Sequence, residues 1–250
     1  LVVGEINGRV PRTFGDTFVS IKDFDVLVES DEKPIYFPRW QPAPVFDKVA
    51  RNVASIIDDG SCIAFSIGPL FESLWKHLRH KRNLGVHSPF MTDPLMDLIR
   101  SGAVSNRKKS TFRGKSVASY ALGTEELSLW LDRNPLVEFQ PLDKVFNPLE
   151  IGRNPRFVCV LPARRVDLSG RIALNFGKGS VTASPGEAID FFNGAELSPR
   201  GLTVFALPSR NRDGEPNIRL SVADMPNQFS FYEAVDLVVM AAVLKMQKTR

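Results

Sequence analysis

The feature that most constrains the fold is a short apolar run at residues 62–67, which ends at a Gly-Pro pair and leads straight into a helical pattern. A run of this length that is closed by Gly68 and Pro69 is typical of a buried strand. Apolar residues then recur at helical spacing, at Leu70, Phe71, Leu74, Trp75 and Leu78. The sequence therefore predicts a strand, a turn and a helix in succession.

Other segments repeat this alternation. Apolar residues from Phe46 to Ile57 recur with helical spacing and predict a helix that ends at residues 58–60. A short strand at 86–88 precedes a helix at 95–100, with Thr92 or Asp93 as its N-cap and Pro94 at its first position. Further strands are expected at 116–122, 137–140, 157–161, 172–176, 203–207 and 237–239, and helices at 125–131 and 185–192. The pattern predicts an α/β fold with an open, mainly parallel sheet flanked by helices.

Ligands of such sheets bind beyond the carboxyl ends of the strands. Gly68, Ser88, Pro89 and Gly186 all fall at such ends, and we expect the loops of Gly68, Pro89 and Gly186 to converge on one cleft. Neighbouring residues of a strand point to opposite faces, so His87 and Ser88 are not expected to form a catalytic pair.

Charge is unevenly distributed along the chain. Residues 76–115 hold ten Lys or Arg and two Asp or Glu, whereas the whole chain carries a net charge of +4. Such a patch either steers a phosphate-bearing ligand or is a solvated face, and no recognition motif for nucleic acid accompanies it. His77 and His80 lie among these cations, which would repel a metal ion, so no metal site is expected.

Composition places the chain among ordinary globular proteins, with 250 residues, 43% hydrophobic and 24% charged. No apolar run approaches the roughly 18 residues of a membrane-spanning helix, and residues 1–4 lack the basic region of an export signal. We expect no membrane association and a cytoplasmic location. Cys62 and Cys159 lie in apolar, strand-like runs, which predicts buried thiols rather than a disulfide framework.

Residues 85–94 read Gly-Val-His-Ser-Pro-Phe-Met-Thr-Asp-Pro. The segment resembles the active-site segment of the acetyl-CoA hydrolase/transferase family, which includes 4-hydroxybutyrate and succinate:acetate CoA-transferases and reads roughly Gly-Ile-His-Thr-Glu-Met-Phe-Ser-Asp-Gly. Residues 4–16, 49–61, 66–70, 134–139, 166–171 and 206–209 match the same family in the same order. The resemblance extends over about residues 1 to 238 and implies a CoA-transferase-like fold.

In the family that this segment resembles, the Glu is the nucleophile, and here Pro89 occupies its position. Proline has neither a nucleophilic side chain nor a backbone N–H, so ordinary transfer through a glutamyl thioester is not expected. Direct hydrolysis stays open, with Asp93 as an alternative base. Asp93 and Asp97 stand at a helix start, where interaction with the helix dipole is the expected role.

A second departure lies at residues 183–191, where the family has a glycine-rich Ser-Gly-Val-Gly-Gly-Gln turn. Gly186, Asp190 and Phe191 match, but Ser184 and Glu187 carry side chains that would partly fill the space left by glycines.

The resemblance implies coenzyme A as a substrate, an acyl-CoA and a small carboxylic acid as partners, and no metal. Gly68, His87, Ser88 and Gly186 are the implied CoA-binding residues, while the catalytic residue is unknown. We expect a domain that acts on or recognises an acyl-CoA thioester without the Glu nucleophile. The alternative is a non-catalytic CoA-binding or assembly domain.

Members of the family are longer than this chain, and the match begins near the end of their N-terminal half. We therefore expect residues 1–45 to be the end of an N-terminal lobe and its connection, residues 46–240 a C-terminal CoA-transferase-like domain, and residues 241–250 a divergent tail. Without the missing lobe, an apolar face would be exposed, and the isolated chain would be poorly soluble or form a homodimer.

Overall fold

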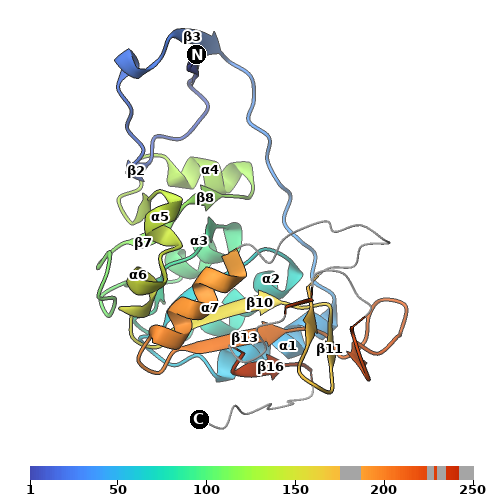
Figure 1. The fold of residues 1–250 in the computed structure, drawn as a ribbon. Helices are drawn as coiled ribbons and strands as arrows, with labels where there is room; N and C mark the ends of the chain where they lie inside the picture. The colour runs from blue at the N-terminus through green and yellow to red at the C-terminus, as the bar shows by residue number, and fades with distance from the viewer. Residues whose placement is uncertain (175–186, 224–227, 230–234, 242–250) are drawn as a thin grey trace.

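The computed structural model describes residues 1–174, 187–223, 228–229 and 235–241 (Figure 1). Helices alternate with strands through most of the chain. In order, the elements after the N-terminal segment are α1 (Pro44–Ser55), β4 (Cys62–Phe65), α2 (Pro69–Leu78), β5 (Gly85–Val86), β6 (Phe90–Met91), α3 (Asp93–Arg100), β7 (Ser116–Ala118), β8 (Tyr120–Ala121), α4 (Glu125–Leu131), β9 (Val137–Phe139), α5 (Leu142–Val145), α6 (Pro148–Gly152), β10 (Phe157–Pro162), α7 (Glu187–Leu197), β13 (Leu202–Ala206) and β16 (Leu237–Val239).

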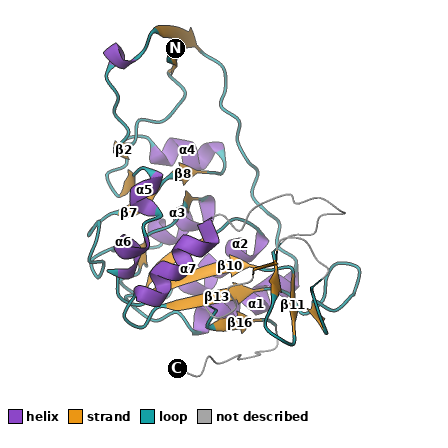
Figure 2. Cartoon of the chain, in the orientation of Figure 1, coloured by secondary structure: helices purple, strands orange, loops and turns teal. Residues whose placement is uncertain are grey.

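A five-stranded sheet forms the centre of the molecule, with the strand order β16-β13-β10-β4-β5. Every neighbouring pair in it is parallel. The strands lie in the middle of the body, with α7 on the near side and α1 and α2 on the far side (Figure 2). The predicted α/β fold with a mainly parallel sheet is confirmed.

The two faces of this sheet explain the unbroken apolar run that marks β4. Ile63 and Phe65 pack in one core with α1, α2 and α3. Cys62 and Ala64 pack in a second core with α6 and α7. A parallel strand that is covered on both faces needs apolar residues at every position rather than at alternate ones.

Smaller sheets surround the central one, so the strands do not form the single sheet that the sequence suggests. A parallel sheet has the order β2-β9-β7, where β2 is Phe14–Gly15, and β6 pairs with β8. A mixed sheet has the order β14-β11-β12-β15 and contains β11 (Arg165–Asp167), β12 (Ile172–Ala173), β14 (Ile218–Arg219) and β15 (Gln228–Phe229). The strand expected at 116–122 divides into β7 and β8, which belong to different sheets.

The N-terminal segment stands apart from this body at the top of Figure 1. Its β1 (Val3–Asn7) and β3 (Val26–Ser30) pair in parallel, with η1 (Ile21–Asp23) between them in sequence. Apolar side chains in this segment are exposed, among them Phe18, Val19 and Ile21. The proposed division at residue 45 stays a prediction.

Two expectations concern the chain as a whole. Both cysteines are buried, as predicted from their apolar surroundings. Across the described residues, none of the helices combines the length and the apolar character needed to span a membrane.

Candidate functional site

The loops that follow β4 and β5 leave the same edge of the central sheet, because these two strands are parallel neighbours. Ser88 ties the loops together: its hydroxyl donates to Phe65 O at 2.9 Å and accepts from Phe65 N at 3.2 Å. Pro89 follows and is buried, and its carbonyl accepts from Ser119 N and Tyr120 N at 3.2 and 3.1 Å. The segment that resembles an active site is therefore fixed by backbone contacts on both sides.

His87 lies on the other side of this segment from Ser88. Its imidazole is fully buried, and Nε2 donates to Val145 O at 2.8 Å. Burial, together with the nearby charge of Lys109, lowers the pKa of His87 to about 3, so the ring is neutral at physiological pH. His87 and Ser88 make no pair with each other in the described hydrogen bonds, as predicted. Their contact with CoA stays a prediction.

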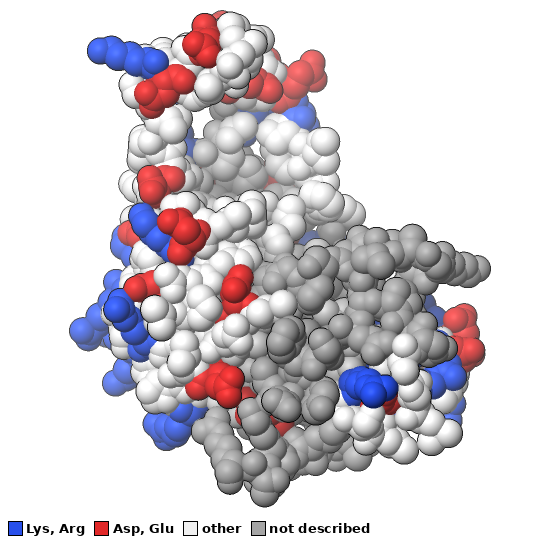
Figure 3. Space-filling view, in the orientation of Figure 1, with Lys and Arg blue, Asp and Glu red and all other residues white. Residues whose placement is uncertain are grey.

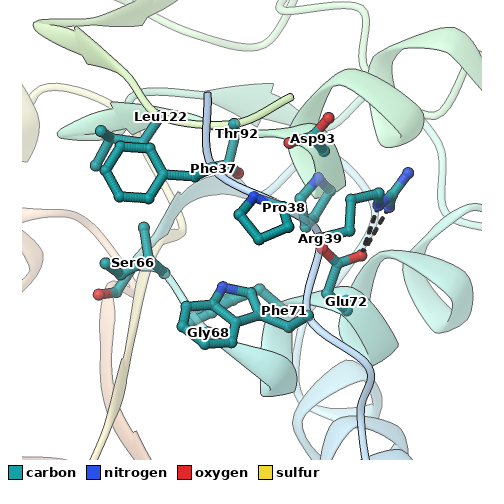
Figure 4. A pocket seen from close by; sticks show the side chains of 14 residues that line it. Phe37, Pro38, Arg39, Ser66, Gly68, Phe71, Glu72, Thr92, Asp93 and Leu122 are labelled. Atoms are coloured by element: carbon teal, nitrogen blue, oxygen red, sulfur yellow. Dashed lines mark hydrogen bonds and ion pairs between the residues drawn. The ribbon is translucent and has the colours of Figure 1, made fainter. Parts of the chain in front are cut away.

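A pocket opens at this edge of the sheet, and Gly68 forms part of its wall (Figure 4). Gly68 has a φ of +126°, a conformation that residues with a side chain rarely adopt. A Cβ at this position would meet open space, which leaves the backbone accessible from the pocket. The pocket is lined by Phe37, Pro38, Arg39, Trp40, Ser66, Ile67, Gly68, Phe71, Glu72, Thr92, Asp93, Pro94, Leu122 and Gly123.

The segment 37–40, which we call the strap, closes one side of the pocket. Phe37 N donates to Gly123 O at 2.9 Å. Arg39 Nη2 donates to Glu72 Oε2 at 2.7 Å and to Asp97 Oδ2 at 2.6 Å. Burial alone would lower the pKa of Arg39, but these bonds to the two carboxylates outweigh it and raise that pKa. One guanidinium thus fastens the strap to both α2 and α3.

The carboxylates near the pocket already have partners. Asp93 is 4% exposed and accepts hydrogen bonds from the backbone N–H and the hydroxyl of Thr124, the N-cap of α4. Gly123 permits this approach, because a Cβ there would lie 2.2 Å from Asp93 Oδ2. Asp97 pairs with Arg39 rather than serving only the helix dipole, which corrects the expectation from its position.

Thr92 differs from these groups. It is the N-cap of α3, but its side chain makes no capping hydrogen bond. The residue is 5% exposed, and its Oγ1 has no hydrogen-bond partner in the part of the chain that the structure describes. In Figure 4 it lies across the pocket from Ser66 and beside Phe37.

Behind the active-site-like segment, two side chains bond to Val86 of β5. Val86 N donates to Asn106 Oδ1 at 2.9 Å, and Val86 O accepts from Lys109 Nζ at 2.7 Å. Lys109 also donates to Lys115 O at 2.7 Å and is 3% exposed. Burial lowers the pKa of Lys109 to about 8.

The run at 76–115 contains Thr92, Asp93 and Pro94, which line the pocket, but its exposed cations lie elsewhere. Its exposed cations fall in the segments that precede β5 and β7, at the amino ends of these strands. Figure 3 shows Lys and Arg side chains along the left rim of the body. Ligand steering and a solvated face both stay predictions for this run.

The structure describes no group of His, Cys, Asp or Glu residues able to hold a metal ion within the ranges it covers. His77 instead pairs with Asp47, with Nε2 and Oδ1 at 2.8 Å.

The sequence predicts part of this site. Gly68 lines the pocket, but Pro89 does not, and Gly186 and Ser184 lie outside the described residues. Convergence of the three predicted loops therefore stays a prediction. The sequence does not predict Arg39, Glu72 and Thr92 as site residues, because Arg39 stands in a proline-rich stretch typical of a connection and Thr92 stands at an N-cap position. The alternation of apolar and polar residues carries no signal for the contacts of Arg39 with Glu72 and Asp97, which lie 33 and 58 positions further along the chain.

A parallel sheet with a pocket at its carboxyl edge defines an α/β protein of the open-sheet class. Residues 123–241 match the model of the acetyl-CoA hydrolase/transferase C-terminal domain. The chain is 33% identical over 216 residues to a 4-hydroxybutyrate coenzyme A transferase of Clostridium kluyveri, covering 86% of this chain and 50% of that one. It is 34% identical over 214 residues to a succinyl-CoA:cyclohexane-1-carboxylate CoA transferase of Geobacter metallireducens, covering 85% and 49%.

Solved structures agree with these relatives. A 4-hydroxybutyrate CoA-transferase from Porphyromonas gingivalis has a TM-score of 0.85 and 28% identity, covering 100% of this chain and 59% of that one. RipA from Yersinia pestis has a TM-score of 0.89 and 25% identity, covering 99% and 56%. The chain belongs to the acetyl-CoA hydrolase/transferase family, as the sequence resemblance predicted. It spans about half the length of the curated relatives it matches.

Proposed function

We propose that the protein recognises an acyl-CoA thioester at the carboxyl edge of the central sheet and does not form a glutamyl-CoA intermediate. The observation that carries the proposal is the pocket walled by Gly68 in a chain whose relatives are CoA-transferases. The partners would be an acyl-CoA and a small carboxylic acid or water. A homodimer stays a prediction.

Two features support the absence of a carboxylate nucleophile. The position that resembles the family's nucleophile holds Pro89. The carboxylates that line the pocket are both engaged, Glu72 with Arg39 and Asp93 with Thr124. A carboxylate that accepts such hydrogen bonds is a weaker nucleophile, because attack must break those bonds.

If the protein is active, water would attack the thioester carbonyl directly, the C–S bond would break, and the products would be the carboxylic acid and CoA, whose thiolate takes up the proton that water loses. The same two features favour the second candidate, a CoA-binding domain without catalytic activity.

Incubation of the full-length protein with acetyl-CoA separates these candidates. Thiol release above the spontaneous rate, with an unchanged intact mass, is expected for direct attack. Binding without thiol release is expected for the non-catalytic candidate. A covalent CoA adduct on the parent protein would overturn the claim that the nucleophile is missing.

Pro89→Glu tests the position itself. If residue 89 stands where the family's nucleophile stands, the variant should gain covalently bound CoA, seen as a mass increase that hydroxylamine or borohydride removes. We expect partial restoration, because residue 89 is buried and a carboxylate there bears a desolvation cost. Pro89→Gln is the matched control, since it has the same shape without the nucleophile. No adduct on Pro89→Glu would favour the non-catalytic candidate.

A further inference from the structure

The pocket beside Gly68 contains a hydroxyl group that lacks a partner among the described residues. Leaving a buried hydroxyl without a hydrogen bond costs about 1–3 kcal/mol, so native structures rarely keep one without a reason. Thr92 stands where a partner was available, because a Thr at an N-cap usually accepts from a backbone N–H of the first turn. Its Oγ1 makes no such bond and lies in the wall of the pocket instead.

The remaining walls are largely apolar. The apolar residues that line the pocket with Thr92 include Phe37, Trp40, Ile67, Phe71 and Leu122. In such surroundings a single hydroxyl makes the pocket selective for ligands with an oxygen opposite Thr92. That oxygen can form a hydrogen bond with Thr92 Oγ1, whereas the apolar walls offer it none.

Charge in the pocket disfavours a ligand whose far end is a carboxylate. Glu72 and Asp93 both line the pocket and are 5% and 4% exposed. Arg39 is the cation beside them, but its guanidinium is shared between Glu72 and Asp97. An anionic ligand end would therefore meet an excess of negative charge in a poorly solvated space.

Size sets a further limit. The cavity volume is about 70 Å³. One water needs about 10–15 Å³ by this measure, so the pocket has room for roughly five to seven atoms of that size. This suits a chain of about four carbons, not the nucleotide of CoA.

We propose that Thr92 is a specificity-determining residue of an acyl pocket that takes short, uncharged chains bearing a hydroxyl. The proposal rests on the proposed function, in which the bound molecule is an acyl-CoA. Pro89 does not line the pocket. In the proposed arrangement the thioester lies near residue 89, outside the pocket, and the far end of the acyl chain reaches Thr92. Glu72 and Asp93 exclude chains that end in a carboxylate.

The test uses the full-length protein and four probes: CoA, and the butyryl, 4-hydroxybutyryl and succinyl derivatives, with CH₂ in place of the thioester sulfur to prevent hydrolysis. Dissociation constants are measured by calorimetry. We expect the hydroxybutyryl probe to bind roughly 2- to 10-fold more tightly than the butyryl probe, the worth of about one net hydrogen bond. The succinyl probe should bind at least about 10-fold more weakly than the butyryl probe.

Thr92→Val keeps the shape and removes the hydroxyl, and should abolish the preference for the hydroxyl-bearing chain. Thr92→Ser keeps the hydroxyl and should retain it, which a purely structural role of Thr92 would not produce. Equal binding of the butyryl and hydroxybutyryl probes to the parent, or a preference that survives in Thr92→Val, would overturn the inference while CoA binding upholds the proposed function. Failure of all four probes to bind would overturn both.

Discussion

Polar groups are buried on both sides of residues 87–92, but the two sides treat them differently. On the side of α6 and α7, His87, Asn154 and Lys109 all have hydrogen-bond partners. On the side of α2 and α3, Thr92 Oγ1 has none among the described residues, and the strap is held over it by Arg39. The first arrangement stabilises the fold. The second leaves a buried hydroxyl without a hydrogen bond beside a pocket, which lowers stability. Such a local cost is typical of a binding site.

The largest effect that would test the first side is acid unfolding. Because the pKa of His87 is lowered to about 3, the unfolded chain, with a His pKa near 6.5, binds more protons between these values. The unfolding free energy is therefore unaffected by His87 titration above about pH 6.5 and falls as pH drops toward 3. The total loss is on the order of several kcal/mol. Denaturant unfolding of the parent and His87→Gln across this range measures it.

The difference in unfolding free energy between the two proteins should shift against the parent as pH falls, because Gln cannot take up a proton. A pH-independent difference would show that His87 is not the titrating group. Carboxylates with lowered pKa values, such as Asp167, also reduce the stability of the fold when they are protonated. Their effect is the same in both proteins and therefore cancels in this comparison.

Asn154→Ala should have the next largest effect. Asn154 is fully buried, and its Oδ1 accepts from Ser110 N and Thr111 N at 3.0 and 3.2 Å. Removing the amide takes away the acceptor of these two N–H groups and the donor to Thr111 Oγ1. We expect a cost of about 3 kcal/mol. Chemical denaturation checks the loss, and Asn147→Ala, which removes an exposed cap on α6, is the matched control.

Arg39→Ala tests the pocket side, where we expect a smaller loss. Arg39 is about one-third exposed, so solvent screens its pairs with Glu72 and Asp97, and the cost should be about 1–2 kcal/mol. Arg51→Ala is the control, because its pair with Asp47 is exposed and spans one helical turn, worth about 0.5 kcal/mol or less. Equal losses in the two variants would mean that the strap is not fastened by Arg39.

The same comparison explains how much could be predicted from sequence. Elements with a helical apolar pattern or an unbroken apolar run were found: the predicted helix at 125–131 and strand at 237–239 coincide with α4 and β16. Helices α5 and α6, with 4 and 5 residues, are too short to show a period and were missed. Gly68 was expected at the ligand edge because a glycine that ends a buried strand is a local signal. Thr92 could not be identified, because an N-cap that makes no capping bond has the same sequence as one that does.

The bonds that Asn106 and Lys109 make to Val86 also bear on how copies of this chain meet in a crowded solution. β5 is the last strand of the central sheet, and such an edge normally offers free N–H and C=O groups to a strand from another molecule. Here the outward N–H groups of Leu84 and Ser88 donate to Ala103 O and Val117 O, and both polar groups of Val86 are taken by side chains. An incoming strand would find no backbone group to pair with, so this edge is protected against aggregation.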